Sequence, residues 1–345
     1  MRSTESSSAR HQTRCADLRY ALEVTITEND GIAGLHHVTA IAGGTQANLD
    51  FYTGVLGLRL VKRTVNFDAP DTYHFYYGDA AGSPGSLLTF FPFEDAAPGR
   101  TGTGMAEATA FAIPEAAFEP WMARLAEEGR DFEGPATRFD EQVLSLRDPD
   151  GLRIELVAEA GLNGAAPGAD SPVTEVQAVR RLHSVTLCVE APERTARLLT
   201  EIFHYEAVGE EAGRLRFRAR SGGPAGIVDL LCQPDRMRGR MGAGTVHHVA
   251  FRARDEAEQR AWRETIAALG LNVTPVLDRQ YFRSIYFREP GGVLFEIATN
   301  PPGFAIDEAP EALGSALKLP PWLEPQRTDI ERRLPPVRLR GTSVG

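Results

Sequence analysis

The sequence of 345 residues contains only three cysteines, Cys15, Cys188 and Cys232, which are too few and too scattered for a disulfide framework or a zinc cluster. It also lacks an excess of positive charge, since 37 Lys and Arg stand against 47 Asp and Glu and the formal net charge is −10. A phosphate backbone is therefore an unfavourable partner, and we expect a small molecule rather than nucleic acid. No apolar run is long enough to span a bilayer, and residues 1 to about 30 lack the apolar core of a signal peptide. These absences predict a cytoplasmic protein with free thiols and no membrane partner.

Polar and proline-rich stretches divide the chain. Residues 1–32 are predicted to be a disordered N-terminal extension, and the Pro/Gly/Ala-rich stretch within 161–178 a linker. The linker separates two predicted domains, 33–160 and 179–300. The tail, 301–345, contains eight prolines, which favour a strap packed on the domains over a long regular element. Its expected anchors are Phe304, Leu317, Leu319 and Trp322.

The stretch from Gly244 to Thr299 holds two histidines and a carboxylate within one βαβββ pattern. Its first strand carries His247 and His248, and a helix follows over Ala257–Gly270 with an apolar stripe of Trp262, Ile266 and Leu269. Short strands are predicted at Val273–Val276 and Ser284–Phe287. The last strand carries Glu296 after a Pro-Gly-Gly turn.

The same βαβββ order occurs four times, and the other three units begin near Gly34, Met105 and Arg181. Units two and four keep one offset of 141 residues, as a duplication requires. The pairs at this offset are Trp121 and Trp262, Gly129 and Gly270, Arg138 and Arg279, Arg147 and Arg288, Pro149 and Pro290, Gly151 and Gly292, and Glu155 and Glu296. Units one and three match over a shorter stretch, with His36 opposite His183 and His37 opposite Ser184. We therefore predict an α+β fold of four βαβββ modules arranged as two similar domains.

Four motifs resemble one enzyme family when they are found together. They are Leu-His-His-Val-Thr at 35–39, Leu-Val-Lys-Arg-Thr-Val-Asn-Phe at 60–67, Tyr-His-Phe-Tyr-Tyr-Gly-Asp at 73–79 and Pro-Gly-Gly-Val-Leu-Phe-Glu at 290–296. Over roughly residues 34–320 the chain resembles the vicinal oxygen chelate superfamily, which includes glyoxalases, bleomycin-resistance proteins and extradiol dioxygenases. Within it, the chain looks like the hydroquinone-type ring-cleaving dioxygenases, among them the 2,6-dichlorohydroquinone dioxygenases.

This resemblance implies an Fe(II) held by His37, His248 and Glu296, with Mn(II) as the alternative metal. Two imidazoles and a carboxylate on one face of an iron leave other positions free for a substrate oxygen and O₂. The implied reaction opens the ring of a hydroquinone-like or other dihydroxylated aromatic compound and incorporates both oxygen atoms. The partners are then a small aromatic substrate and O₂, and a homo-oligomer is left open.

Strand alternation independently selects the second histidine of each pair, because neighbours on a strand point to opposite faces. Val38 and Val249 suit packing under a helix, which leaves His37 and His248 on the other face. The same alternation would send His36 and His247 toward the helix, whereas the resemblance places both beside the substrate. The conflict disappears if each regular strand begins only at its second histidine.

The resemblance also maps Thr39, Arg279 and Tyr286 to the substrate pocket. Arg279 could stabilise a phenolate and Tyr286 could hydrogen-bond a substrate or oxygen species, while a surface ion pair with Asp278 or a neighbour is the plainer explanation for Arg279. His247 is the expected acid/base, because an imidazole can take a phenolic proton and return it.

Two other functions remain open at the level of sequence. A glyoxalase-type isomerase or lyase would need a fourth protein ligand, but the last strand of the first unit offers no carboxylate before Glu94, beyond its end. A metal-free small-molecule binding protein of the resistance type would need no ligand set at all. Because the implied ligands come from units one and four, we expect these two units to be neighbours in space and to form the active cup of the fold, which leaves units two and three to form a second, metal-free cup. For Glu155 in that second cup, a salt bridge or an exposed face is favoured over metal ligation, so one metal is expected per chain.

Overall fold

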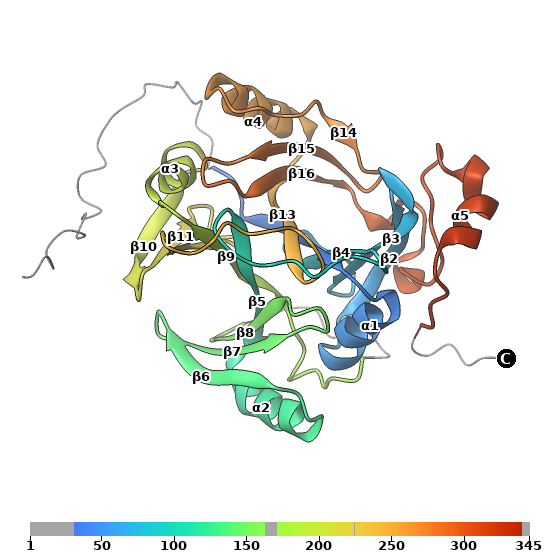
Figure 1. Cartoon of the computed structure of the whole chain (residues 1–345), viewed down its shortest axis with the longest axis horizontal. Coiled ribbons are helices and arrows are strands. Elements are labelled where there is room, and N and C mark those ends of the chain that lie inside the picture. The colour runs from blue at the N-terminus through green and yellow to red at the C-terminus, as the bar shows by residue number, and fades with distance from the viewer. Residues whose placement is uncertain (1–30, 163–170, 224, 340–345) are drawn as a thin grey trace, which may run out of the picture.

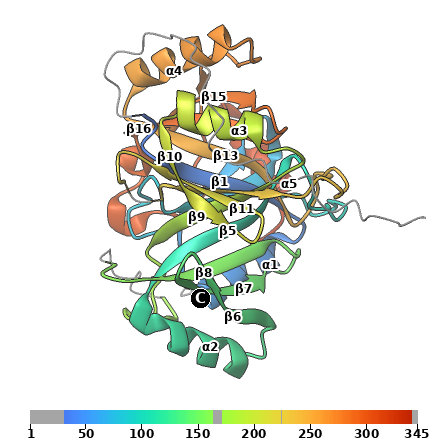
Figure 2. The same cartoon turned by 90° about the vertical axis from the view of Figure 1, so that its left-hand side faces the viewer.

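The computed structural model describes residues 31–162, 171–223 and 225–339. The predicted N-terminal extension, apart from its last two residues, and the middle of the predicted linker lie outside these ranges. The described chain forms two curled mixed sheets of eight strands each, one above the other (Figure 2). No described helix has both the length and the apolar character needed to cross a membrane.

The first sheet combines modules one and four, which stand at opposite ends of the sequence (Figure 1). Its strands, in spatial order, are β14 (Leu277–Asp278), β15 (Phe282–Arg288), β16 (Leu294–Pro302), β13 (Thr245–Ala253), β1 (Leu35–Ala42), β4 (Leu87–Pro92), β3 (Ala69–Gly78) and β2 (Arg59–Asn66).

The second sheet combines modules two and three in the same manner. Its strands, in spatial order, are β10 (Tyr205–Glu211), β11 (Arg214–Ala219), β12 (Ile227–Cys232), β9 (Arg181–Val189), β5 (Met105–Pro114), β8 (Arg153–Glu159), β7 (Glu141–Arg147) and β6 (Phe132–Arg138). The α+β fold of four βαβββ modules is confirmed, as is the expectation that modules one and four are spatial neighbours. Where the sequence divides into domains, at 160 and 179, stays a prediction.

Antiparallel pairing of the first strands joins the modules, β1 with β13 and β5 with β9. In every module the first and last strands pair in parallel, as β13 does with β16. A parallel pair needs a crossover connection, and the helix and inner strands of each module supply it. The outer face of each sheet is closed by helices, with α4 (Glu256–Ala268) lying along β15 and β16 and α2 (Phe118–Glu127) beyond β6 (Figure 1).

Buried tryptophans and left-handed glycines make the duplication visible in the structure. Trp121 and Trp262 are both buried at the sheet side of their helices. Gly129 and Gly270 follow those helices with φ of 63° and 76°, a conformation that costs an L-residue energy and glycine little. The helix α4 begins at Asp255, whose carboxylate accepts a hydrogen bond from the backbone N–H of Glu258.

Two details of the fourth module differ from the prediction. Leu269 is 36% exposed, and Gln259 takes its place on the inner face of α4, donating to the backbone carbonyls of Arg283 and Ile297. Val273–Val276 is not a strand, because only Val273 bridges to β15 and the paired segment is Leu277–Asp278.

In modules one and three the crossover helix is short and ends in a π-helical turn. In module one α1 (Thr45–Asp50) continues as a π-helix over Phe51–Val55, and in module three α3 (Glu193–Arg197) continues over Leu198–Ile202. Gly57, with φ of 67°, follows the first of these helical segments.

The C-terminal segment wraps around the first module beside β2 and β3 (Figure 1) and includes the helix α5 (Arg327–Arg333). Phe304 and Leu319 are buried anchors, and the ring of Phe304 stacks on Tyr281, 5.0 Å between centroids. Trp322 is 46% exposed, and its ring contacts Phe67 edge-on, so it packs on the first module without being buried.

A buried ion pair attaches this segment to β2. Lys62 is fully buried, and its Nζ contacts Asp307 at 2.6 Å and also Glu308. Glu308 also accepts hydrogen bonds from the backbone N–H groups of Gly314 and Ala316. Its carboxylate therefore depends on Lys62 for charge and on the strap for hydrogen bonds.

Replacing Lys62 with methionine should lower the free energy of unfolding by about 3–5 kcal/mol, because it leaves a buried carboxylate without its cation. Urea denaturation followed by circular dichroism measures the change. The control is Arg332→Met, which breaks an exposed pair with Asp329 and should cost less than about 1 kcal/mol. Equal losses in the two variants would contradict the importance of the buried pair.

Candidate metal centre

Two β-bulges bring both histidine pairs to one face of the first sheet. The register of β1 against β13 shifts between Leu35 and His37, which makes His36 the extra residue, and shifts again opposite Thr39 and Ala40, which makes His247 the extra residue. A bulge interrupts strict alternation, so neighbours can point to the same side. Both strands begin before their histidines, so the prediction that each regular strand starts at its second histidine is wrong; the bulges resolve the conflict instead.

The three predicted ligands meet at one point. His37 Nε2 lies 3.2 Å from His248 Nε2, and Glu296 Oε2 lies 2.8 Å from His248 Nε2 and 3.4 Å from His37 Nε2. Adjacent ligands at about 2.1 Å from a metal in a right-angled arrangement are about 3.0 Å apart, so this triangle fits one face of an octahedral ion. Among the described residues it is the only such group of three.

The charge of Glu296 points to the same conclusion. Burial alone would raise the pKa of this fully buried carboxyl, but the neighbouring His37 and His248 hold it well below its usual range. Burial lowers the pKa of His248, which favours the neutral imidazole that a metal requires. Ser284 donates to Oε1 at 2.5 Å, and no donor among the described residues is aligned on Oε2. Oε2 of this buried carboxylate faces the two ring nitrogens, and a divalent cation held by the three groups would balance its charge.

His36 and His247 each contact the ring of the next residue. The Nδ1 atoms of His36 and His37 are 2.9 Å apart, and those of His247 and His248 are 2.8 Å apart. Burial first, and then the neighbouring histidine, lowers the pKa of both His36 and His247 to about 3, so both are neutral at physiological pH. Because Nε2 of each predicted ligand faces the shared point, its Nδ1–H can donate to this neighbour and fix the ring plane.

Arg279 and Tyr286 lie together beside the ligands. The Nε–H of Arg279 donates to the hydroxyl of Tyr286 at 3.3 Å, and the Tyr286 ring meets His248 edge-on with 5.5 Å between centroids. Burial and then Glu296 raise the pKa of Tyr286, so its hydroxyl stays protonated. Arg279 pairs with Asp68 at 3.0 Å rather than with Asp278, which pairs with Arg283. Arg279 therefore does form an ion pair, but with Asp68 and not with Asp278.

Sequence reasoning missed four polar side chains of this cup: His74, Tyr76, Thr89 and Ser284. The alternation of β3 contained the signal for two of them, since His74 and Tyr76 share one face while Phe75 and Tyr77 enter the core on the other. Thr89 could be found only from the strand register.

Thr89 occupies the place in module one that Glu296 has in module four. In β13 and β16 the partner of Glu296 is Ala250, two residues after His248; in β1 and β4 the partner of Thr89 is Thr39, two residues after His37. A hydroxyl thus replaces the fourth carboxylate of a symmetric site. Glu94, the next acidic residue, instead accepts from the backbone N–H of Thr45 at the start of α1, 2.9 Å away.

The cup of the second sheet contains ion pairs in place of a ligand set. Arg138 donates to both oxygens of the buried Glu155, at 2.7 and 3.1 Å, and Arg153 adds a contact of 3.3 Å. His183 contacts Glu141 at 3.0 Å, and Glu107 pairs with Arg236 at 2.8 Å. The predicted salt bridge of Glu155 is confirmed.

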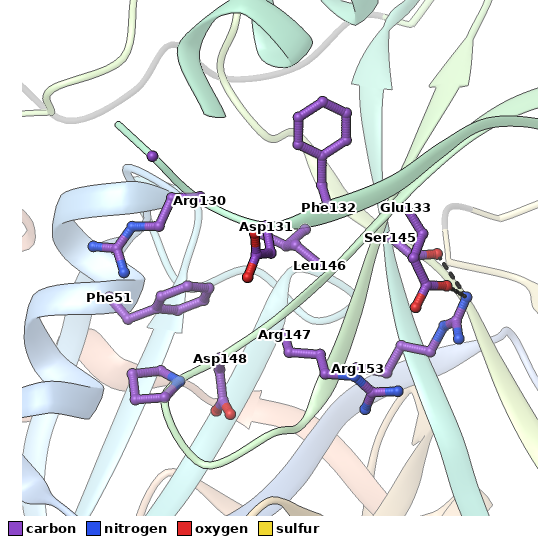
Figure 3. A pocket seen from close by; sticks show the side chains of 12 residues that line it. Phe51, Arg130, Asp131, Phe132, Glu133, Ser145, Leu146, Arg147, Asp148 and Arg153 are labelled. Carbon is purple, nitrogen blue, oxygen red and sulfur yellow. Dashed lines mark hydrogen bonds and ion pairs between the residues drawn. The ribbon is translucent and has the colours of Figure 1, made fainter. Parts of the chain in front are cut away.

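A hollow of about 470 Å³ lies elsewhere, between the π-helical turn Phe51–Val55 and the second module (Figure 3). Charges of both signs line it, and several are already paired: Arg153 with Glu133 and Ser145, and Arg147 with the carbonyl of Gly151. A smaller hollow of about 340 Å³ has His247 in its wall, together with Arg238 and Arg288. This second hollow adjoins the candidate centre.

Relatives of the chain carry names that agree with this chemistry. MhqO and MhqE of Bacillus subtilis (strain 168), both provisionally named ring-cleaving dioxygenases, are 47% and 45% identical over 310 and 302 residues, which cover 89% and 88% of this chain and 97% and 98% of the relatives. The chlorohydroquinone/hydroquinone 1,2-dioxygenase of Sphingobium indicum is 34% identical over 312 residues, or 88% of this chain and 96% of that protein.

Solved structures agree on the fold. A crystal structure from Bacillus subtilis, provisionally named a dioxygenase, is 46% identical, covers 90% of this chain and 99% of its own, and superposes with a TM-score of 0.86. Glyoxalase I from Zea mays, at 15% identity and a TM-score of 0.56, covers 77% of this chain and 92% of its own and shares the fold alone. The sequence profile of the glyoxalase/bleomycin resistance protein/dioxygenase superfamily matches residues 34–156 and 181–297. The chain therefore belongs to this superfamily and, within it, to the ring-cleaving dioxygenases.

Proposed function

We propose that the protein is a non-haem Fe(II)-dependent dioxygenase of the extradiol type that opens the ring of hydroquinone-like or other dihydroxylated aromatic compounds. The observation that carries this proposal is the buried triangle of His37, His248 and Glu296. Two nitrogen donors and one oxygen donor on one face suit iron in oxygenases, with Mn(II) as the alternative. The hydroquinone class comes from the name of the Sphingobium relative.

A divalent metal held by these residues would supply Lewis acidity and open positions for a substrate oxygen and O₂. The chain's own residues supply the rest. His36 accepts from the ring of His37 and His247 from the ring of His248, which fixes the orientation of each ligand ring, while Ser284 holds Glu296 so that Oε2 faces the histidines.

Four side chains are proposed to act on the substrate. The always-charged Arg279 beside the neutral Tyr286 can stabilise a phenolate oxygen, and Thr39 can donate a hydrogen bond to the ring substituents. His247 is proposed to take a phenolic proton and return it. Its Nδ1 accepts from His248 and its own proton is on Nε2, so it would take the phenolic proton at Nδ1, with release of the His248 hydrogen bond. A bound substrate anion would raise its low pKa, and the hollow of about 340 Å³ beside it offers a route to solvent. We propose a soluble cytoplasmic enzyme, in keeping with an aromatic substrate.

A glyoxalase-type isomerase is the less favoured function. That chemistry was expected to require a fourth protein ligand, and the equivalent position holds Thr89, which lies 2.8 Å from Thr39 and 2.9 Å from His74. The hydroxyl is thus already hydrogen-bonded to two neighbours. A metal-free binding protein is disfavoured because it would leave Oε2 of the buried Glu296 without an aligned donor among the described residues, and would give no role to the meeting of His37, His248 and Glu296.

Anaerobically Fe(II)-loaded protein should consume oxygen when hydroquinones are added. The measurement is an oxygen-electrode assay on panels of hydroquinones and catechols, with product mass spectrometry under ¹⁸O₂ expected to show both labelled atoms in the opened ring. Protein treated with chelator and desalted should be inactive until Fe(II) is restored. Absence of substrate-dependent uptake across both panels would refute the proposal.

Substitution of a metal ligand and substitution of a histidine that supports a ligand should differ in their effect on iron content. His248→Ala should abolish activity and lose iron, because it removes one of three protein ligands, whereas His36→Ala should keep iron and lose activity by about 10–100-fold. Metal analysis after desalting measures both. His183→Ala, in the second cup, is the matched control and should keep both iron and activity. Equal iron retention in His248→Ala and His36→Ala would mean that the wrong histidine of the pair has been assigned as the ligand.

Each chain should hold one iron despite its duplicated scaffold. Glu296→Ala should lose the metal, while Glu155→Ala should keep it, because Glu155 is already neutralised by arginines. Iron content per chain after anaerobic reconstitution tests this. A stoichiometry near two, or iron loss in the Glu155 variant, would contradict the assignment of the active cup.

A further inference from the structure

A string of four polar side chains crosses three neighbouring strands beneath the candidate centre. Tyr76 Oη lies 2.9 Å from His74 Nδ1, His74 Nε2 lies 2.9 Å from Thr89 Oγ1, and Thr89 Oγ1 lies 2.8 Å from Thr39 Oγ1. The four come from β3, β4 and β1, which are adjacent in the first sheet. All four are buried, and His74, at 9%, is the most exposed.

The direction of the hydrogen bonds follows from Tyr76. Its hydroxyl proton needs an acceptor in a buried site, and among the described residues His74 Nδ1 is the one it has. Burial lowers the pKa of His74 well below its usual value, so the ring is neutral and carries one proton. With Nδ1 accepting, that proton must be on Nε2, which donates to Thr89.

The string therefore ends in an oriented donor. Thr89 accepts a hydrogen bond from His74 Nε2–H and donates its own hydroxyl hydrogen to Thr39, whose oxygen is then an acceptor in the string. The hydroxyl hydrogen of Thr39 is left free to point elsewhere. Thr39 lies two residues after His37 on β1 and opposite His248 on β13, so it lies beside both imidazoles.

We propose that Tyr76, His74 and Thr89 are positioning residues that fix the hydroxyl of Thr39 as a hydrogen-bond donor toward an anionic oxygen of the bound substrate. The proposal rests on the function proposed above and extends it to three residues outside the ligand set. No proton is transferred along the string; its role is orientation. In the reverse direction Thr39 would donate away from the cup, and the Tyr76 hydroxyl would lack an acceptor among the described residues.

Removing the hydroxyl that sets the direction is the first test. Tyr76→Phe frees Nδ1 of His74, so both tautomers become available, and kcat/KM for the best hydroquinone should fall about tenfold with iron content unchanged. The matched control is Tyr77→Phe, the next residue of β3, whose hydroxyl donates to Asn48 at 2.9 Å on the opposite face. It removes an equally buried hydroxyl and should leave kcat/KM within twofold.

A double-mutant cycle separates orientation of Thr39 from general packing. In a Thr39→Val background, Tyr76→Phe should change kcat/KM by less than twofold, because the group that it orients is gone. Thr89→Ser should restore most of what Thr89→Val loses, since serine keeps the hydroxyl. If Tyr76→Phe lowers kcat/KM tenfold in both backgrounds, the proposed orientation of Thr39 by the string is wrong, while the dioxygenase assignment stays intact.

A readout independent of catalysis tests the hydrogen-bond direction itself. In ¹⁵N-labelled, metal-free protein, NMR of the histidine side chains should show His74 protonated on Nε2, with Nδ1 becoming partly protonated in Tyr76→Phe but not in Tyr77→Phe. If His74 of the wild type is protonated on Nδ1, the proposed direction of the hydrogen bonds along the string is wrong. The wild type could also show the expected tautomer but neither consume oxygen nor bind 4-nitrocatechol anaerobically. That result would overturn the proposed function, and with it the role of the string in substrate binding.

Discussion

The fully buried carboxylate of Glu296 is the constraint on which the rest of the first cup depends. An ionised carboxylate without compensation is among the most costly groups to bury, and here the nearest partners are two imidazoles, whose Nε2 atoms lie 2.8 and 3.4 Å from Oε2. The surrounding elements position these three groups: Ser284 holds one carboxylate oxygen, and His36 and His247 hold the rings. A divalent cation completes this arrangement, and protein groups alone do not.

The second cup shows what the same scaffold does when its carboxylate has another source of charge. There Arg138 bonds both oxygens of Glu155, so a guanidinium stands where the first cup would use a metal. Its counterpart in the first cup, Arg279, instead turns to Tyr286 and Asp68. Duplication thus preserved the backbone and the positions of both residues, while the partner of one arginine separates a structural cup from a reactive one.

The C-terminal strap belongs to the same arrangement. The buried Lys62, on β2, holds Asp307 and Glu308, and Asp307 accepts a hydrogen bond from Tyr281 at 3.0 Å. Phe304 packs on Tyr281 and on Tyr76, the first residue of the hydrogen-bonded string that ends at Thr39. The strap therefore supports the floor of the cup through packing and one buried cluster of charges.

Sequence alone determined the four-module α+β fold, the three residues that meet in the first cup and the pairing of Glu155, because repeats, strand periodicity and motif resemblance all leave traces in local order. It also implied that modules one and four are neighbours, since residues of both had to reach one site. Three features needed the tertiary structure: the bulges that turn His36 and His247 toward the ligands, the true partner of Arg279, and the string from Tyr76 to Thr39. Each depends on strand register, which is set by pairing between segments as much as 211 residues apart, as His37 and His248 are. Shifting that register by one residue would exchange the faces of the sheet, and no local pattern in either segment specifies it.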